Sequence, residues 1–215
     1  DASRLLYANV APAGGSAVSY AGLNEAGMGI SCADFDGDGL IDIFVTHYYH
    51  QKNTLYHNRG QLVFDDDSRR TRIAATSYES LGFGTCPLDF DRDGDPDLFV
   101  ANGHVLGPEQ EPNAMRPQLL MNHRGQFYDI SDQAGAYFRK LLLGRGVAGA
   151  DYDNDGDLDV VVNHLNGGAE IFRNESAAPR VATRLNGAAG NTRGVGARIR
   201  FTGGSVVQSQ EMRAG

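Results

Sequence analysis

Tryptophan is absent from this chain of 215 residues, and cysteine, proline and basic side chains are scarce. The only two cysteines, Cys32 and Cys86, exclude a fold stapled by several disulfides and a four-cysteine zinc site. Seven prolines are too few for a collagen-like chain or a proline-rich disordered chain. Lysine and arginine number 19 against 27 acidic residues, and the resulting net charge of −8 argues against binding to nucleic acid or to an anionic membrane surface.

Long apolar runs are also missing. No stretch approaches the ~18 residues that cross a bilayer, so we expect no membrane span. The sequence begins at Asp1 without a basic and apolar leader, and we expect it to be a processed or excised piece. Glycine, by contrast, is abundant at 28 residues. The length suffices for one sizeable domain, or for one domain and a small second one.

An aspartate-rich segment occurs three times, over residues 27–42, 82–97 and 144–159. The copies align without gaps and share the pattern Gly-x-Gly-x-x-x-x-Asp-x-Asp-x-Asp-Gly-x-x-Asp. Their first aspartates, Asp34, Asp89 and Asp151, lie 55 and 62 residues apart. A nearly fixed period of this size predicts supersecondary units that are stacked or arranged around an axis.

Two strand signals follow each acidic cluster. The first is a run of about five residues rich in Val, Ile and Phe, at 41–45, 97–101 and 158–162. The second is an apolar stretch that ends in Asn, at 55–58, 119–122 and 171–174, with a fourth copy at 6–9. That fourth copy lacks an acidic cluster before it, so we expect the chain to begin part-way through a repeat. Four or so short strands per unit are typical of a β-propeller blade.

Other segments interrupt this pattern only locally. Residues 103–117 carry three prolines and are expected to form an elongated surface loop. Residues 132–143 hold the one short helical turn that we expect. The Gly-x-Gly pairs are expected to let strands pack closely, and since no helix follows them they are not nucleotide-binding loops.

Each cluster places Asp at positions 1, 3, 5 and 9 and Gly at position 6. Crowded carboxylates would repel and raise one another's pKa, and a hard dication such as Ca²⁺ removes that penalty. We therefore predict about three Ca²⁺ sites, in which position 7 offers a backbone carbonyl. Their ligands are Asp34, Asp36, Asp38, Leu40 and Asp42; Asp89, Asp91, Asp93, Asp95 and Asp97; and Asp151, Asp153, Asp155, Asp157 and Asp159.

These loops differ from those of an EF-hand. An EF-hand loop closes with a bidentate Glu at position 12 and lies between helices. Position 12 here is Val45, Val100 or Val162, inside the expected strand. The alternative that Asp-Gly segments are only solvated turns explains one copy better than three copies in register.

The repeated pattern resembles the FG-GAP/VCBS repeats, which are the calcium-binding blades of integrin-like β-propellers. The resemblance covers about residues 20 to 175 and implies an all-β fold, a piece of a seven-bladed propeller, with calcium at the aspartates named above. Residues 184–200 resemble the opening of an ASPIC/UnbV domain, with Asn191, Gly194, Gly196 and Ala197 at the matching positions. The expected division is therefore a propeller segment at 1–178 and a truncated ASPIC/UnbV-like segment at 179–215, as in secreted, cartilage-acidic-protein-like proteins.

The expected function is a non-catalytic, calcium-binding scaffold, secreted or at the cell surface, that binds or adheres to an extracellular protein or glycan. A secreted carbohydrate-active lyase or hydrolase on the same propeller is the alternative, with His47, Asn102 and His164 at equivalent repeat positions near one face. Polar caps of strands are the plainer interpretation of these three residues. Cys32 and Cys86 are either buried free thiols or a disulfide between neighbouring units. The basic residues at 68–72 follow Asp65–Asp67, which would offset their charge.

Overall fold

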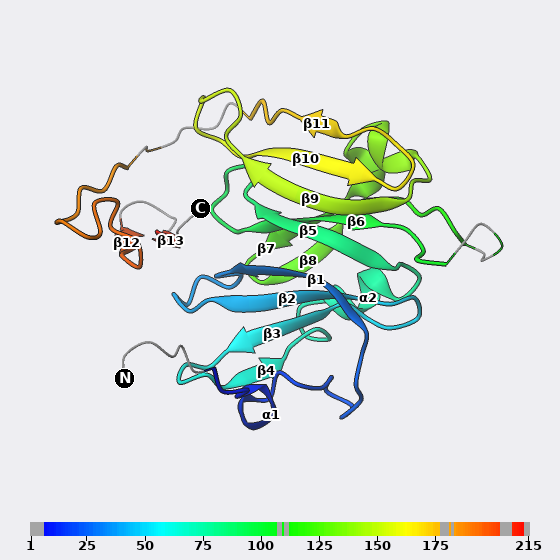
Figure 1. Cartoon of the computed structure of the whole chain (residues 1–215), viewed down its shortest axis with the longest axis horizontal. Coiled ribbons are helices and arrows are strands. Elements are labelled where there is room, and N and C mark those ends of the chain that lie inside the picture. Colours follow the sequence, from blue (N-terminus) through cyan, green and yellow to red (C-terminus); the bar gives the residue numbers. More distant parts are fainter. Residues whose placement is uncertain are drawn as a thin grey trace.

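The computed structural model describes residues 7–106, 109, 112–176, 181, 183–202 and 208–212. Most of its regular structure is β, as predicted, and the strands form three antiparallel sheets and a separate two-stranded hairpin. Figure 1 shows the three sheets stacked on one another, with the hairpin to one side. Among the described residues no helix is long and apolar enough to cross a membrane.

Each sheet is a meander in which neighbouring strands along the chain are also neighbours in space. The first contains β1 (Gly27–Ala33), β2 (Asp42–His47), β3 (Thr54–Asn58) and β4 (Phe64–Asp66). The second contains β5 (Gly82–Leu88), β6 (Asp97–Asn102), β7 (Gln118–His123) and β8 (Gln126–Asp129). The third contains β9 (Gly144–Ala150), β10 (Asp159–His164) and β11 (Glu170–Phe172). The hairpin pairs β12 (Arg198–Phe201) with β13 (Gln208–Glu211).

This arrangement confirms the strands predicted after each acidic cluster, which are β2, β6 and β10. The predicted strands ending in Asn are β3 and β7, whereas β11 stops at Phe172, two residues before its Asn. Four strands per unit hold for the first two sheets, and the third has three among the described residues. The fourth copy at 6–9 is not a strand where it is described, since residues 7–9 have no regular structure and Leu6 lies outside the described residues.

The first strands of the three sheets pack side by side, with β5 between β1 and β9. This close approach needs the Gly-x-Gly pairs, as predicted. A Cβ on Gly84 would lie 2.4 Å from the backbone nitrogen of Val147 in β9, and one on Gly29 would lie 2.0 Å from the carbonyl oxygen of Phe83 in β5. Any larger residue at either position would push neighbouring sheets apart.

The hydrophobic core lies between the sheets, in two layers on either side of β6. Leu98 and Val100 face the layer shared with the first sheet, and Phe99 and Ala101 face the layer shared with the third. Because successive side chains of a strand point to opposite faces, a strand covered on both faces is apolar throughout. This explains why the run after the cluster shows no alternation of polar and apolar residues.

Helical structure is short and lies mostly outside the predicted place. The stretch 132–143 contains no α-helical turn; it overlaps two 3-10 helices, η1 (Ser131–Gln133) and η2 (Tyr137–Arg139). The sequence analysis missed α1 (Ala11–Gly14) and α2 (Ile73–Ser77), which are only four and five residues long. Residues 103–117 contain no strand in their described part, in agreement with the predicted loop. The boundary at 178/179 falls on residues 177–180, which lie outside the described residues, so it stays a prediction.

Candidate metal centres

The three acidic segments connect the first and second strands of their sheets, β1 to β2, β5 to β6 and β9 to β10. They therefore lie at the same end of the strands in all three sheets. The connections β2–β3 and β6–β7 lie at the opposite end of the strands, and so the loops that follow His47 and Asn102 are on the other side of the molecule. The repeat thus places all acidic loops on one side of the stack.

Left-handed backbone conformations shape each acidic loop at positions 4 and 6. Position 6 is glycine in every copy, and Gly39, Gly94 and Gly156 have φ of 89°, 100° and 92°. This confirms that glycine there permits the turn. Position 4 is also left-handed, at Gly37, Arg92 and Asn154. The sequence analysis missed this second requirement because position 4 is not always glycine.

The aspartate at position 9 is buried in every loop and ties the loop to the rest of its sheet. Asp97 accepts hydrogen bonds from the backbone N–H groups of Phe90 at 3.0 Å and Asn122 at 2.7 Å. Asp42 and Asp159 make the same pair of contacts in the other two sheets. One of the two donors is always the Asn that ends the second repeated element. The two sequence motifs recur together because this hydrogen bond joins them.

The second sheet also reaches the first acidic loop through this Asn. The side-chain amide of Asn122 donates to the carbonyl oxygen of Phe35 at 2.8 Å and to that of Pro96 at 3.0 Å. A single buried side chain therefore holds the loops of two neighbouring sheets in a fixed relation.

Most of the predicted ligand side chains are brought together in groups that could hold a metal ion. In each group one ligand atom per residue lies within 4.8 Å of the others: Asp34, Asp36 and Asp38; Asp89, Asp91 and Asp97; and Asp151, Asp153 and Asp159. Two further groups include histidine: Asp36, Asp42 and His57; and Asp93, Asp95 and His123.

Three predicted ligands stand outside these groups. Asp157 forms an ion pair with Arg92 from the second loop, and Asp155 is not part of a group among the described residues. Leu40 was expected to offer its carbonyl; its N–H donates to Asp38 at 2.7 Å. The carbonyl roles of Leu40, Asp95 and Asp157 stay predictions.

The electrostatics of the loops are those of crowded, partly buried carboxylates. Burial, with smaller contributions from the nearby charges of Asp91 and Asp89, raises the pKa of Asp97 to about 8. Burial likewise raises the pKa of Asp42 and that of Asp89 to about 6. Two backbone donors to Asp97 act in the opposite direction and do not cancel the effect of burial. The loops therefore hold carboxylates that ionise with difficulty unless a cation is close.

The donor set fits a hard dication. Asp34 Oδ1 and Asp89 Oδ1 are buried and accept no hydrogen bond, although the other oxygen of each carboxylate accepts one from the glycine at position 6. A buried carboxylate oxygen without a partner is costly, and a bound cation would satisfy it. Position 12 lies inside β2, β6 and β10, which agrees with the argument against an EF-hand.

Sequence reasoning missed the histidine and arginine side chains that reach these loops. His57 lies against the first loop, and Arg173 Nη1 lies 3.7 Å from Asp153 Oδ2 in the third. Both residues directly precede the Asn of the second repeated element, where the second sheet has Met121. Their shared position directly before the repeated Asn is the sequence signal that could have identified these two residues.

Of the three residues named for a catalytic alternative, Asn102 and His164 act as polar caps of their strands. The amide of Asn102 donates to Arg116 O at 2.8 Å and to Gln118 at 3.0 Å. His164 Nδ1 lies 2.9 Å from Gly168 O, and its Nε2 lies 3.0 Å from the hydroxyl of Tyr137. His47 is buried, with its Nε2 3.6 Å from Glu25, and burial lowers its pKa to about 4.

The structure also bears on the two cysteines and on the basic residues at 68–72. Cys32 and Cys86 are not joined by a disulfide; Cys86 is buried and Cys32 is partly buried. In the basic stretch, Arg70 pairs with Asp67 at 2.5 Å, which agrees with the expected offset of charge.

The stacked meanders and their acidic loops define a repeat protein built from β-propeller blades. The profile of the FG-GAP-like repeat matches residues 34–100 and 89–162, which is more than half of the chain, and the chain belongs to this family. The three sheets are accordingly called blades below.

Curated relatives carry the same name in three animals. The chain is 30% identical over 146 residues to Cartilage acidic protein 1 of Xenopus tropicalis, which covers 67% of this chain and 21% of the relative. It is 29% identical over 140 residues to the protein of that name from Mus musculus (65% and 20%) and 28% over 151 residues to the one from Homo sapiens (70% and 20%). The chain thus spans about a fifth of the length of these relatives.

Proposed function

We propose that this chain is part of a calcium-stabilised, extracellular β-propeller scaffold that binds a protein or a glycan. The observation that carries the calcium role is the buried, unpartnered oxygen Asp89 Oδ1 of the second loop, which lies among further carboxylates. Extracellular calcium is abundant enough for such sites to be permanently filled. The relatives named cartilage acidic protein support the extracellular location.

Calcium binding is tested by counting ions. Native mass spectrometry of the chain in Ca²⁺ should show two or three bound ions, and Asp89→Ala should remove one of them because it deletes a buried oxygen donor of the second loop. Asp132→Ala is the matched control, since Asp132 is an exposed aspartate paired with Arg116 outside the acidic loops. A wild-type chain that binds no Ca²⁺, or an Asp89→Ala chain that binds as many ions as wild type, would contradict the calcium role.

The side opposite the acidic loops supplies the binding face in this proposal. An aromatic cluster lies there, formed by Tyr48, Tyr49, His50, Tyr78 and His104. The His50 ring is stacked between Tyr49 and Tyr78, with ring centroids 4.0 and 5.1 Å apart, although His50 has a left-handed φ of 62°. Tyr78 is 48% exposed. Exposed rings with polar tips suit the apolar faces and hydroxyl groups of sugars.

Glu79 and Ser80, which directly follow Tyr78, line a pocket of about 540 Å³. Its lining includes three acidic residues, Glu79, Asp129 and Asp132, and one basic residue, Arg116, so the lining is negatively charged. This charge balance favours a neutral or amino sugar over a sulfated one. The proposal therefore assigns a neutral or amino-sugar glycan to this face.

Glycan binding can be measured on an array of neutral, amino-sugar and sulfated glycans. We expect wild type to retain neutral or amino-sugar glycans, and Tyr78→Ala to lose about 5- to 30-fold in affinity because it removes an exposed ring, worth about 1–2 kcal/mol. Tyr7→Ala, at a tyrosine that is 90% exposed elsewhere, is the control. Selective binding of sulfated glycans, or equal losses in both variants, would contradict this face. Turnover of a bound glycan would instead support the carbohydrate-active enzyme.

A further inference from the structure

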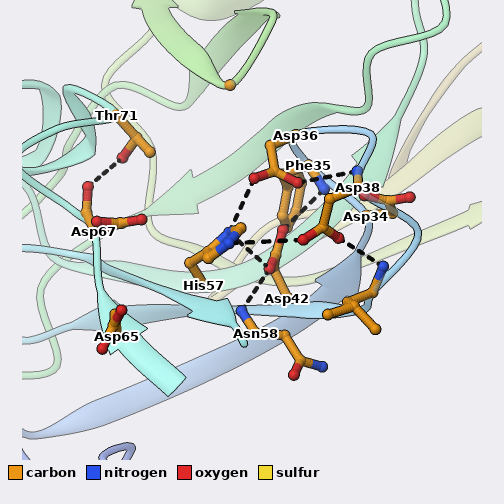
Figure 2. Close-up of polar contacts among 12 residues, drawn as sticks. Asp34, Phe35, Asp36, Asp38, Asp42, His57, Asn58, Asp65, Asp67 and Thr71 are labelled. Atoms are coloured by element: carbon orange, nitrogen blue, oxygen red, sulfur yellow. Dashed lines mark hydrogen bonds and ion pairs between the residues drawn. The ribbon is translucent and has the colours of Figure 1, made fainter. Parts of the chain in front are cut away.

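His57 makes the first acidic loop chemically different from the other two. It lies in β3 and is 5% exposed, and Figure 2 shows its ring among Asp36, Asp38 and Asp42. The equivalent residue of the second blade, Met121, offers a thioether, and that of the third, Arg173, offers a positive charge. Only the first of the three loops thus has an imidazole at this position.

The distances around His57 match those between ligands of one small ion. Nδ1 lies 3.1 Å from Asp36 Oδ2 and 3.4 Å from Asp42 Oδ1. Nitrogen and oxygen atoms bound at about 2.0–2.2 Å to a common ion, at tetrahedral or octahedral angles, are about 3.0–3.5 Å apart. Asp42 also accepts two backbone hydrogen bonds, which fix its carboxylate and leave lone pairs for a cation. The two distances from the imidazole nitrogen therefore match a coordination sphere, and the three ligand atoms all lie within 4.8 Å of one another.

A separate observation points to a cation ligand in this loop. Asp34 is 8% exposed, and its Oδ1 is buried without a hydrogen-bond partner. Asp34, Asp36 and Asp38 each offer an oxygen within 4.8 Å of the others. The loop can thus supply further oxygen donors beside the His57 site.

We propose that the first loop binds a first-row transition dication, Zn²⁺, through His57, Asp36 and Asp42, in preference to Ca²⁺. Imidazole nitrogen is a good ligand for Zn²⁺ and a poor one for Ca²⁺, which takes oxygen. The proposal deepens the metal-binding role proposed above and restricts Ca²⁺ to the remaining loops. The competing interpretation is that His57 is a proton-bearing counter-ion, hydrogen-bonded to Asp36, that no metal contacts.

The test is a Zn²⁺ titration of the Ca²⁺-saturated chain, followed by calorimetry and by native mass spectrometry. We expect one tight Zn²⁺ per chain, and His57→Met, which introduces the residue of the second blade, should weaken it at least about tenfold. The comparison variant is His123→Met, because His123 belongs to the other histidine-containing group, with Asp93 and Asp95, but lies 4.0 Å from Asp93 and is 61% exposed. Zn²⁺ binding that is equally tight in wild type and His57→Met would overturn the proposal, as would a loss confined to His123→Met.

A second measurement needs no substitution in the loop. Zn²⁺ should move the imidazole nitrogen resonances of His57 to values typical of a coordinated ring, with the line saturating at one equivalent. A His57 ring that stays doubly protonated at saturating Zn²⁺ would support the counter-ion and overturn the proposal. If Zn²⁺ does not bind His57, Ca²⁺ binding by the second loop is unaffected. If the calcium role is wrong, Asp89→Ala binds as many Ca²⁺ ions as wild type.

Discussion

Removing Ca²⁺ with a chelator at pH 8 should lower the thermal unfolding midpoint of this chain by on the order of 10–30 °C. Each site that is filled at a hundred times its dissociation constant adds about 2.7 kcal/mol to the free energy of unfolding. Two or three such sites therefore add about 5–8 kcal/mol, and about 1 kcal/mol corresponds to 2–4 °C in a domain of this size. Differential scanning calorimetry with and without chelator measures the difference.

The same experiment should depend on pH in a defined direction. Asp97, Asp42 and Asp89 have pKa values raised to about 8, 6 and 6 in the folded chain, above the usual aspartate value of 3.8. A raised carboxyl pKa stabilises the fold at low pH, and that contribution is lost as the pH rises through the folded value. The metal-free chain should therefore become more stable as the pH falls from about 8.5 to 6.

Ca²⁺ binding requires ionised carboxylates, so its contribution should shrink over the same pH range. The gap between the two midpoints should consequently be widest at pH 8–8.5 and narrow toward pH 6. Measurements are best kept above pH 6, because His47, with its pKa lowered to about 4, destabilises the fold as acid protonates the unfolded chain. A gap that is absent at pH 8, or that widens on acidification, would count against metal binding by these carboxylates.

Asp97→Ala should destabilise the chain by about 2–6 kcal/mol in chelator, and by more in Ca²⁺, because Asp97 also belongs to the ligand group of the second loop. Asp97 is fully buried and accepts the backbone N–H groups of Phe90 and Asn122. Its removal leaves two buried donors without a partner, and each such donor costs about 1–3 kcal/mol. Urea unfolding in chelator and in Ca²⁺ measures both values.

Asp91→Ala is the matched variant for this experiment. Asp91 belongs to the same loop and the same ligand group, but it is exposed and accepts only a turn hydrogen bond from Asp93 at 3.2 Å. We expect it to lower stability in Ca²⁺ and to change it little in chelator. If both variants behaved alike in chelator, the structural role assigned to position 9 would be wrong.

The sequence by itself determined the repeat, the strands and the acidic loops. The gap-free copies at 27–42, 82–97 and 144–159 have the same register in all three blades, because the position of each Asp and Gly is dictated by local turn geometry. Short apolar runs such as 97–101 were predicted as buried strands because a run of about five residues, rich in Val, Ile and Phe over the three copies and bounded by turn residues, suits a strand better than a helix. Features that depend on neighbouring residues along the chain can therefore be predicted from the sequence.

Only the tertiary structure decided how the loops differ. His57 and Arg173 lie 15 and 14 residues beyond the last Asp of their loops, and strand pairing carries them back to the carboxylates. The reach of Asn122 to Phe35, 87 residues away, likewise depends on how two blades pack. Spacing along a chain does not encode such contacts, because they arise from pairing and packing between segments whose separation varies with loop length.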